Sequence, residues 1–323
     1  MNKIIKIILF CLGLSLLFFL LHHVGFKETI RHISEANPVF LFLGVLSYFI
    51  VISIRSFKWF ILIRVIDPEV KYRKFLPFYL VNTLIGNTTP FKSGEAVTPF
   101  LFKRYLKIPV GRGFFVVILD RFLELMTFVI ILILVFFYIL NRGIENGLVL
   151  SVFKWLFAVF FLILIFLIIV AVSRKIVLKV VSFFKKYSFL KRIFEFIEKE
   201  LNVFYEALPL FKNKGIYQTV VPLTLLGWLF DFLAFYFIFS SVFSIYFMDI
   251  VVAQVINVGA SLITFIPGGL GVSEISSVYM LSLFGHSIIL STAAILLVRL
   301  LLTGFLLIFG LIGSLLLKEK KNN

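Results

Sequence analysis

The chain alternates long apolar runs with short polar breaks. Runs of about 20 apolar residues are long enough to cross a bilayer as helices. Stretches such as FFLILIFLIIVAV at 160–172 do not alternate apolar and polar positions, which argues against a membrane β-barrel. The pattern predicts an all-α, polytopic integral membrane protein. Its six full spans are expected at 4–24, 39–63, 113–140, 148–172, 217–243 and 288–317.

Two further apolar regions are interrupted. Regions 75–102 and 250–286 each hold two shorter apolar pieces around a Pro/Gly break. Each piece falls short of the roughly 20 residues that a comfortable span needs. We expect either re-entrant helical hairpins or pairs of short full spans, which gives six to eight transmembrane helices. Both alternatives return the chain to the side it came from, so the charge pattern does not distinguish them.

The order of elements is the same in the two halves. Residues 1–147 run span, span, hairpin, span, and residues 148–323 repeat that order with the opposite orientation. The breaks also share a weak pattern, PFKSGE at 90–95 and PGGLGVSE at 267–274. Inverted repeats with broken helices recur in transporters. We therefore expect a single membrane domain, 1–323, built as an inverted repeat.

Charge orients this domain. The chain is 61% hydrophobic and 15% charged, yet its net charge is +16, with 32 Lys and Arg residues. Most of these fall in cytoplasmic segments if both termini are cytoplasmic, as the positive-inside rule favours. The positive charge thus points to membrane topology and anionic lipids, and a nucleic-acid partner is not expected.

Segment 173–215 is amphipathic at helical spacing. It predicts one or two helices on the cytoplasmic surface, which either touch lipid or form a solvated linker.

The break at 265–276, FIPGGLGVSEIS, carries candidate chemistry. Its proline removes a backbone donor, and its glycines permit conformations that other residues avoid. Exposed backbone at membrane depth must be buried in protein or line a wet cavity. The resuming helix would point its positive end at an anion such as phosphate, while the glutamate receives a cation or only caps the helix. The candidate substrate-contacting residues are Gly268, Gly269, Gly271 and Glu274.

The first break and the start of the third span add polar groups. At the break, Lys92 is placed to pair with a lipid phosphate, and Glu95 with Lys92 or a substrate; a simple capped cytoplasmic loop is the alternative. Asn87 joins this group. In LDRFLEL at 119–125, the acidic positions lie four apart on one helical face. A structural or gating ion-pair network is favoured there over direct substrate contact. This stretch contributes Asp120, Arg121 and Glu124.

Four more charged residues lie inside predicted spans. Arg55 and Lys58 share one face of the second span, where Lys58 is placed to extend to the cytoplasmic interface. Asp231 and Arg299 fall near the middle of their spans, so an ion pair between them is expected. Enzymatic signatures, including phosphate-binding loops, nucleophile elbows and metal-ligand clusters, are absent from the sequence. We expect no catalytic residue, no metal, no cofactor and no enzymatic activity.

Four blocks, RSFKWFIL (55–62), GNTTPFKSGEAV (86–97), LDRFLEL (119–125) and PGGLGVSE (267–274), together resemble the flippase-like membrane domain family. This is the transmembrane region of lysylphosphatidylglycerol synthases, also found as stand-alone UPF0104-type membrane proteins. The resemblance covers nearly the whole chain. Lys92 stands where the family usually has an arginine. A bidentate phosphate contact at that site is therefore not expected.

The resemblance implies a protein of a prokaryotic plasma membrane that moves or binds lipids with charged headgroups. We expect a flippase-like translocase for anionic or aminoacylated phospholipids or lipid-linked substrates. The alternatives are an accessory or catalytic membrane subunit in lipid modification, acting with a soluble transferase, and a scaffold. Membrane lipids, such a transferase and further copies of the chain are the expected partners.

Overall fold

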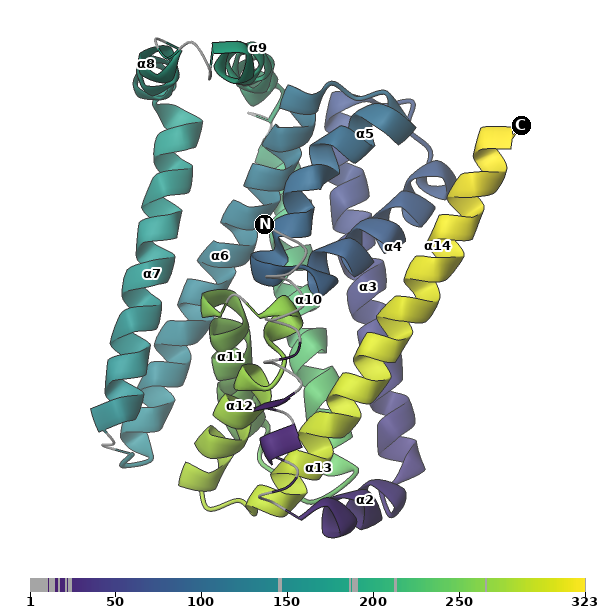
Figure 1. Cartoon of the computed structure of the whole chain (residues 1–323), viewed down its shortest axis with the longest axis vertical. Helices are drawn as coiled ribbons and strands as arrows, with labels where there is room; N and C mark the ends of the chain where they lie inside the picture. Colours follow the sequence, from purple (N-terminus) through teal and green to yellow (C-terminus); the bar gives the residue numbers. More distant parts are fainter. Residues whose placement is uncertain are drawn as a thin grey trace.

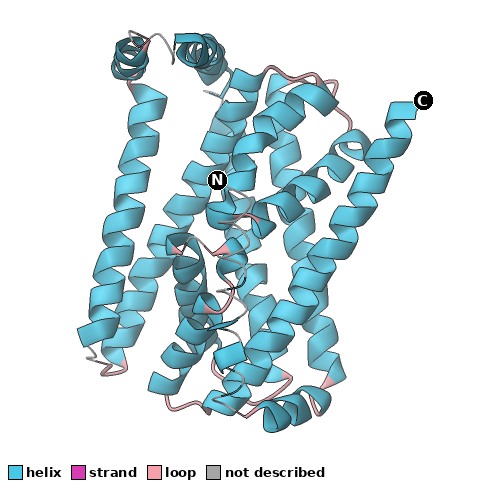
Figure 2. Cartoon of the chain, in the orientation of Figure 1, coloured by secondary structure: helices cyan, strands magenta, loops and turns pink. Residues whose placement is uncertain are grey.

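A computed structural model describes residues 11, 15, 16, 18–20, 22, 25–144, 147–185, 187, 191–211, 214–264 and 266–322. Side chains of residues 90–93 and of a few other residues are outside this description. Within the described part, the chain forms helices joined by short loops and contains no strand (Figure 2). The predicted all-α class is confirmed.

Five of the six predicted spans are present as helices long and apolar enough to cross a membrane. The remaining one, 4–24, falls mostly outside the described residues. The last span is one continuous helix that includes a π-helical turn, η4 (Arg299–Thr303). The chain is therefore a multi-pass membrane protein. Its spans are α3 (Pro38–Ile66), α6 (Val110–Asn141), α7 (Gly147–Val172), α10 (Lys214–Ser240) and α13–η4–α14 (Ile288–Val298, Arg299–Thr303, Gly304–Asn322).

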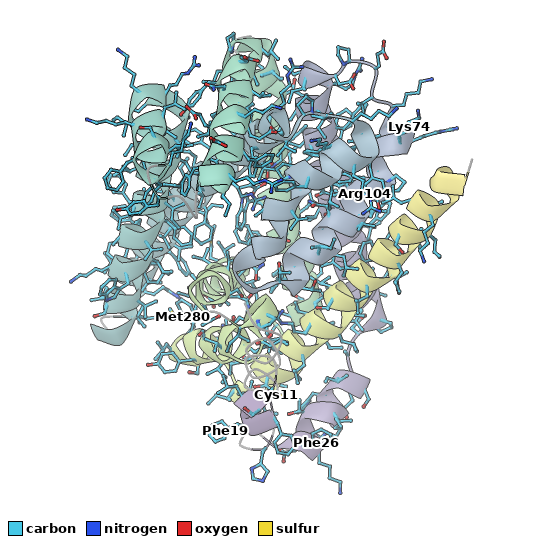
Figure 3. The ribbon with its side chains drawn as sticks, turned by 45° about the horizontal axis from the view of Figure 1, so that its top comes forward. Cys11, Phe19, Phe26, Lys74, Arg104 and Met280 are labelled. Atoms are coloured by element: carbon cyan, nitrogen blue, oxygen red, sulfur yellow. The ribbon has the colours of Figure 1, made fainter. Side chains whose placement is uncertain are left out.

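The amphipathic segment forms a helical layer at one end of the bundle, which we call the α8/α9 end (Figure 1). The opposite end carries α2 (Phe26–Ser34). Basic side chains such as Lys74 and Arg104 project at the α8/α9 end (Figure 3). The layer consists of α8 (Arg174–Phe184), α9 (Lys191–Ala207) and the short 3-10 helix η2 (Leu208–Phe211).

Both interrupted regions are re-entrant hairpins. The helices of the first hairpin lie in the α8/α9 half of the molecule and those of the second in the opposite half (Figure 1). The hairpins enter from opposite ends, as an inverted repeat requires; the repeat itself and its boundary at 147/148 stay predictions. The first hairpin is α4 (Tyr72–Thr88), η1 (Pro90–Val97) and α5 (Thr98–Leu106). The second is α11 (Phe247–Ile263), η3 (Pro267–Gly269) and α12 (Val272–Leu283).

Glycines make the tip of the second hairpin possible. Gly268, Gly269 and Gly271 have φ values of 61°, 65° and 80°. These values lie in the left-handed region that side chains with a Cβ rarely adopt. A Cβ on Gly269 would also lie 2.4 Å from the hydroxyl oxygen of Ser261 on α11. The glycines therefore serve both backbone conformation and close packing.

Helix α9 is docked on the bundle. The Glu200 carboxylate accepts a 2.6 Å hydrogen bond from the backbone N–H of Gly111, near the start of α6. The rings of Phe115 and Phe204 also pack with centroids 5.3 Å apart. The carboxylate satisfies a free amide of the first turn, where helices favour negative charge. Helix α9 is thus part of the folded bundle and not only a solvated linker.

This close crossing predicts a large effect from one methyl group. A Cβ on Gly111 would lie 2.2 Å from the backbone oxygen of Glu200, whereas one on Gly304 would meet nothing within 4 Å. Gly111→Ala is expected to destabilise the docked layer by about 1–3 kcal/mol through overpacking. Limited proteolysis should then cut within 173–215 faster than in the wild type. Gly304→Ala should leave that rate unchanged; equal rates for both variants would contradict the docking.

Helix α7 is the least buried of the five described spans. Only 17% of the residues in its most apolar stretch are buried, against 44% for α10. Its protein contacts gather on one side, where Phe160 packs on Phe128 of α6 with ring centroids 4.6 Å apart. Most of its exposed surface is apolar, with Lys154 near its start as an exception, and we expect this surface to face lipid.

Candidate functional site

A buried lysine lies at the centre of the candidate site. Lys58, on α3, has a side chain only 1% exposed. Its Nζ lies 2.8 Å from Oδ1 of Asp120 and 2.5 Å from Oε1 of Glu124, both on α6. The two carboxylates are four residues apart, so they share one helical face and reach the same cation. The expectation that Lys58 extends to the membrane interface is wrong, because α6 supplies its counter-charges inside the bundle.

Arg121 connects this cluster to the first hairpin. Its Nη2 donates a 2.7 Å hydrogen bond to Oδ2 of Asp120, and its Nε lies 3.3 Å from Oε2 of Glu95. Asp120 therefore serves two cations, and Glu95 is held at the hairpin tip. The ion pairs of the predicted network on α6 are present, and its structural or gating role stays a prediction. The predicted Lys92–Glu95 pair involves a side chain that lies outside the described residues.

The tip of the first hairpin is built by threonines. The Thr89 hydroxyl accepts a 2.7 Å hydrogen bond from the Gly94 amide, and the Thr98 hydroxyl donates a buried 2.6 Å bond to Asn82. These bonds satisfy polar groups that would otherwise be costly inside the bundle. They also place Glu95 above the backbone of Gly86, where an added Cβ would lie 3.1 Å from the Glu95 Cγ.

The second hairpin is held by an arginine from the last span. Arg299 begins the π-helical turn η4, a kind of turn often found at functional sites. Its guanidinium pairs with the fully buried Glu274. It also donates hydrogen bonds to the Gly268 carbonyl (2.8 Å) and the Ser273 hydroxyl (2.6 Å). One side chain thus binds the backbone and the carboxylate of the broken helix together.

The predicted Asp231–Arg299 pair is wrong. Arg299 pairs with Glu274, while Oδ2 of Asp231 lies 3.7 Å from Nη2 of Arg55 and 3.5 Å from Nε2 of Gln254. The cause is packing, because α10 lies along α3 and brings Asp231 opposite Arg55, whereas η4 brings its arginine to the hairpin tip. Trp228 packs in the same place, with the Arg55 guanidinium 5.9 Å from its ring centroid.

The two hairpin tips meet inside the bundle. Elements η1 and η3 are in contact, and a Cβ on Gly268 would lie 3.4 Å from the backbone oxygen of Asn87. The same Cβ would lie 3.8 Å from Arg299. The Asn87 side chain itself bonds to the Thr83 carbonyl of its own helix (2.9 Å). Asn87 of the first half and Gly268 of the second half are thus brought together, although contact of the predicted site residues with substrate stays a prediction.

The sequence interpretation missed a third charged cluster. The fully buried Asp249, at the start of α11, accepts a 2.8 Å hydrogen bond from the hydroxyl of Tyr138. It also lies 2.8 Å from Nε2 of His286 and 3.6 Å from Nη2 of Arg142. This cluster ties the base of the second hairpin to the end of α6. In the sequence, the only sign of this cluster is an acidic residue, Asp249, in the first turn of a helix.

Comparisons with known proteins agree with this architecture. The UPF0104 membrane protein MJ1595 of Methanocaldococcus jannaschii is 25% identical over 95% of this chain and 94% of its own length. A UPF0104 membrane protein of Methanothermobacter thermautotrophicus is 27% identical over 91% and 90% of the two chains. The UPF0104 membrane protein PH1989 of Pyrococcus horikoshii is 25% identical over 98% of each. A family model described as the lysylphosphatidylglycerol synthase TM region matches residues 3–310, so the chain belongs to that family.

Proposed function

We propose that this protein is a flippase-like translocase for phospholipids with charged headgroups. The observation that carries the proposal is the meeting of two hairpin tips whose carboxylates are each held by an arginine from a full span. Glu95 is held by Arg121, and Glu274 by Arg299. Broken helices that meet inside a bundle are a recurring transporter plan.

The chemistry of the tips suits a charged headgroup. An isolated charge inside a bilayer is costly, so intramembrane charges pair with one another or serve function. A headgroup phosphate has the geometry to replace Glu95 on the Arg121 guanidinium. The released carboxylate then accepts an ammonium group. In this scheme the protein exchanges internal ion pairs for pairs with the headgroup, while the acyl chains stay in lipid.

The basic α8/α9 end supports a cytoplasmic location for both termini under the positive-inside rule. We propose this orientation in the plasma membrane of a prokaryote. It is tested with a maleimide that does not cross membranes, after Cys11→Ser and Lys179→Cys substitutions; Lys179 is exposed on α8. Labelling is expected in inside-out vesicles. Labelling in right-side-out vesicles would instead show that the α8/α9 end lies outside the cell.

The proposal does not assign catalysis to this chain. The family description names a synthase, which favours a second candidate function, a membrane subunit that presents lipid to a soluble transferase. Co-purification of such a transferase, with no lipid transport by the chain alone, would support this second candidate.

Lipid movement in proteoliposomes tests the first candidate. Wild-type protein is expected to exchange fluorescent phosphatidylglycerol or its lysyl derivative between leaflets faster than protein-free liposomes do. Glu95→Gln should slow this exchange about tenfold, equivalent to about 1.4 kcal/mol, because the charge that pairs with Arg121 is lost. Glu69→Gln, on an exposed loop at the same end, is the matched control and should match the wild type. Equal rates for wild type and empty liposomes would reject the translocase.

A further inference from the structure

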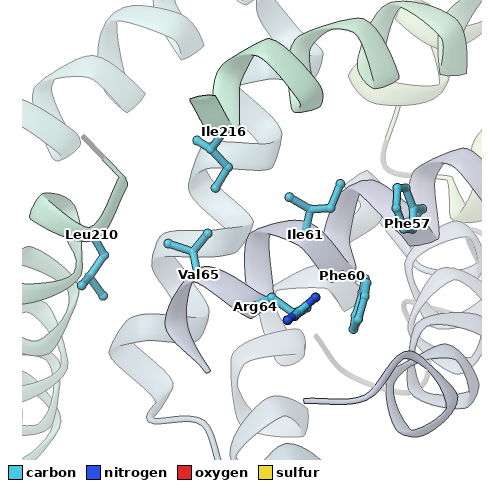
Figure 4. A pocket seen from close by; sticks show the side chains of 7 residues that line it. All are labelled: Phe57, Phe60, Ile61, Arg64, Val65, Leu210 and Ile216. Atoms are coloured by element: carbon cyan, nitrogen blue, oxygen red, sulfur yellow. The ribbon is translucent and has the colours of Figure 1, made fainter. Parts of the chain in front are cut away.

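A pocket of about 410 Å³ lies on the side of the bundle (Figure 4). This volume is in the range of small-molecule sites. Its walls come from the last turns of α3, from η2 and from the start of α10. Six of its seven lining residues are apolar. They are Phe57, Phe60, Ile61, Val65, Leu210 and Ile216, and the seventh is Arg64.

The pocket uses a different face of α3 from the candidate site. Phe57, Ile61 and Arg64 follow the i, i+4, i+7 spacing of one helical stripe. Phe57 is 47% exposed, whereas the neighbouring Lys58 is fully buried against α6. The pocket therefore opens away from the hairpin tips, and what binds there is independent of the proposed translocation path.

The one charged group of the pocket is placed at membrane-surface depth. Arg64 lies in the last turn of a span, at the α8/α9 end. Its guanidinium sits over the Phe60 ring, 5.8 Å from the centroid, and none of the ion pairs among the described residues includes it. Phe60 is itself fixed edge-on against Tyr72, with centroids 5.2 Å apart. The cation is thus positioned by aromatic packing while its donors stay free.

We infer that this pocket is a binding site for an anionic phospholipid, separate from the translocation path. The Arg64 guanidinium pairs with the lipid phosphate, and an acyl chain lies along the apolar wall below it. Arginine suits phosphate because its planar fork donates two parallel hydrogen bonds. Arg64 lies in the last turn of α3, a helix long enough to cross the hydrocarbon core, and a lipid phosphate is expected at that level. The inference goes beyond the proposed function, because it requires binding and no transport.

Native mass spectrometry of the full chain, titrated with phosphatidylglycerol in detergent, tests the site. Arg64→Gln is expected to weaken the tightest binding event about tenfold. Leu210→Trp fills the pocket from an exposed position and should abolish that event without disturbing the core. Lys74→Gln, an exposed basic residue at the same end, is the matched control and should bind like the wild type. Each variant must elute as a single species.

Two further titrations separate the sources of affinity. Diacylglycerol, which lacks the phosphate, should bind the wild type at least about tenfold more weakly. Millimolar inorganic phosphate should not displace the lipid, because it cannot use the apolar wall. Equal losses in Arg64→Gln and Lys74→Gln would overturn the site in favour of general attraction to basic surface. Unchanged binding by Leu210→Trp would overturn it too, since the pocket would then be unused.

Discussion

Replacing Lys58 with methionine is expected to lower the free energy of unfolding by about 3–5 kcal/mol, because Glu124 then lacks its cation inside the bundle and Asp120 keeps only Arg121. The methionine fills most of the lysine volume, so a cavity contributes little to the loss. The midpoint of unfolding in an SDS titration measures the effect. Lys58→Arg keeps the charge and should be milder.

A compensating triple variant separates lost charge from lost packing. Adding Asp120→Asn and Glu124→Gln to Lys58→Met removes the uncompensated negative charge, and it should restore most of the stability. Asp120→Asn alone is the informative comparison, since that residue also accepts a hydrogen bond from Arg121. If the triple variant were as unstable as Lys58→Met alone, electrostatics would not be the cause.

Arg299→Gln is expected to release the tip of the second hairpin. The change removes the partner of the buried Glu274 and the hydrogen bonds to Gly268 and Ser273, a loss of about 3–5 kcal/mol for an uncompensated buried charge. Hydrogen exchange of amides in 266–277 should therefore speed up. Lipid transport, under the proposed function, should fall at least about tenfold.

The matched control for Arg299→Gln is Arg55→Gln. Arg55 also pairs with an acid inside the bundle, Asp231, whose other partner, Gln254, lies within α11 before the hairpin tip. It should lose stability without faster exchange in 266–277. Arg299→Gln combined with Glu274→Gln should recover stability but not transport. Slow exchange in Arg299→Gln would show that other contacts hold the tip.

Much of the fold follows from hydrophobic periodicity and breakers. The long apolar runs predicted the five described full spans to within a few residues, because the bilayer sets a minimum helix length. The second hairpin followed from Pro267 and its neighbouring glycines, which cannot continue a helix at φ values near 60–80°. The predicted amphipathic segment appears as two helices, but its docking through Glu200 could not be seen in the sequence.

Partners of the charged residues were harder to predict. Depth within a span shows that Asp231 and Arg299 need counter-charges, but not which faces of which helices meet. Lys58 was predicted to reach the interface because lysines near the end of a span generally do so. In the structure it stays inside, because α6 supplies two carboxylates at the same level. The Asp249 cluster joins residues far apart in sequence, each of which resembles an ordinary interfacial residue. Pairing of this kind depends on helix rotation, which one sequence does not contain.

The low burial of α7 makes the tilt of this helix sensitive to bilayer thickness. Its 24-residue apolar stretch is about 36 Å long, against a hydrocarbon core of about 30 Å. Because it is the least buried of the described spans, α7 is expected to tilt when its length exceeds the bilayer thickness. Helix α8 begins two residues after α7 ends, so tilting of α7 would carry α8 with it, whereas α9 stays docked on α6. Thin and thick membranes should therefore place α8 differently relative to the docked α9.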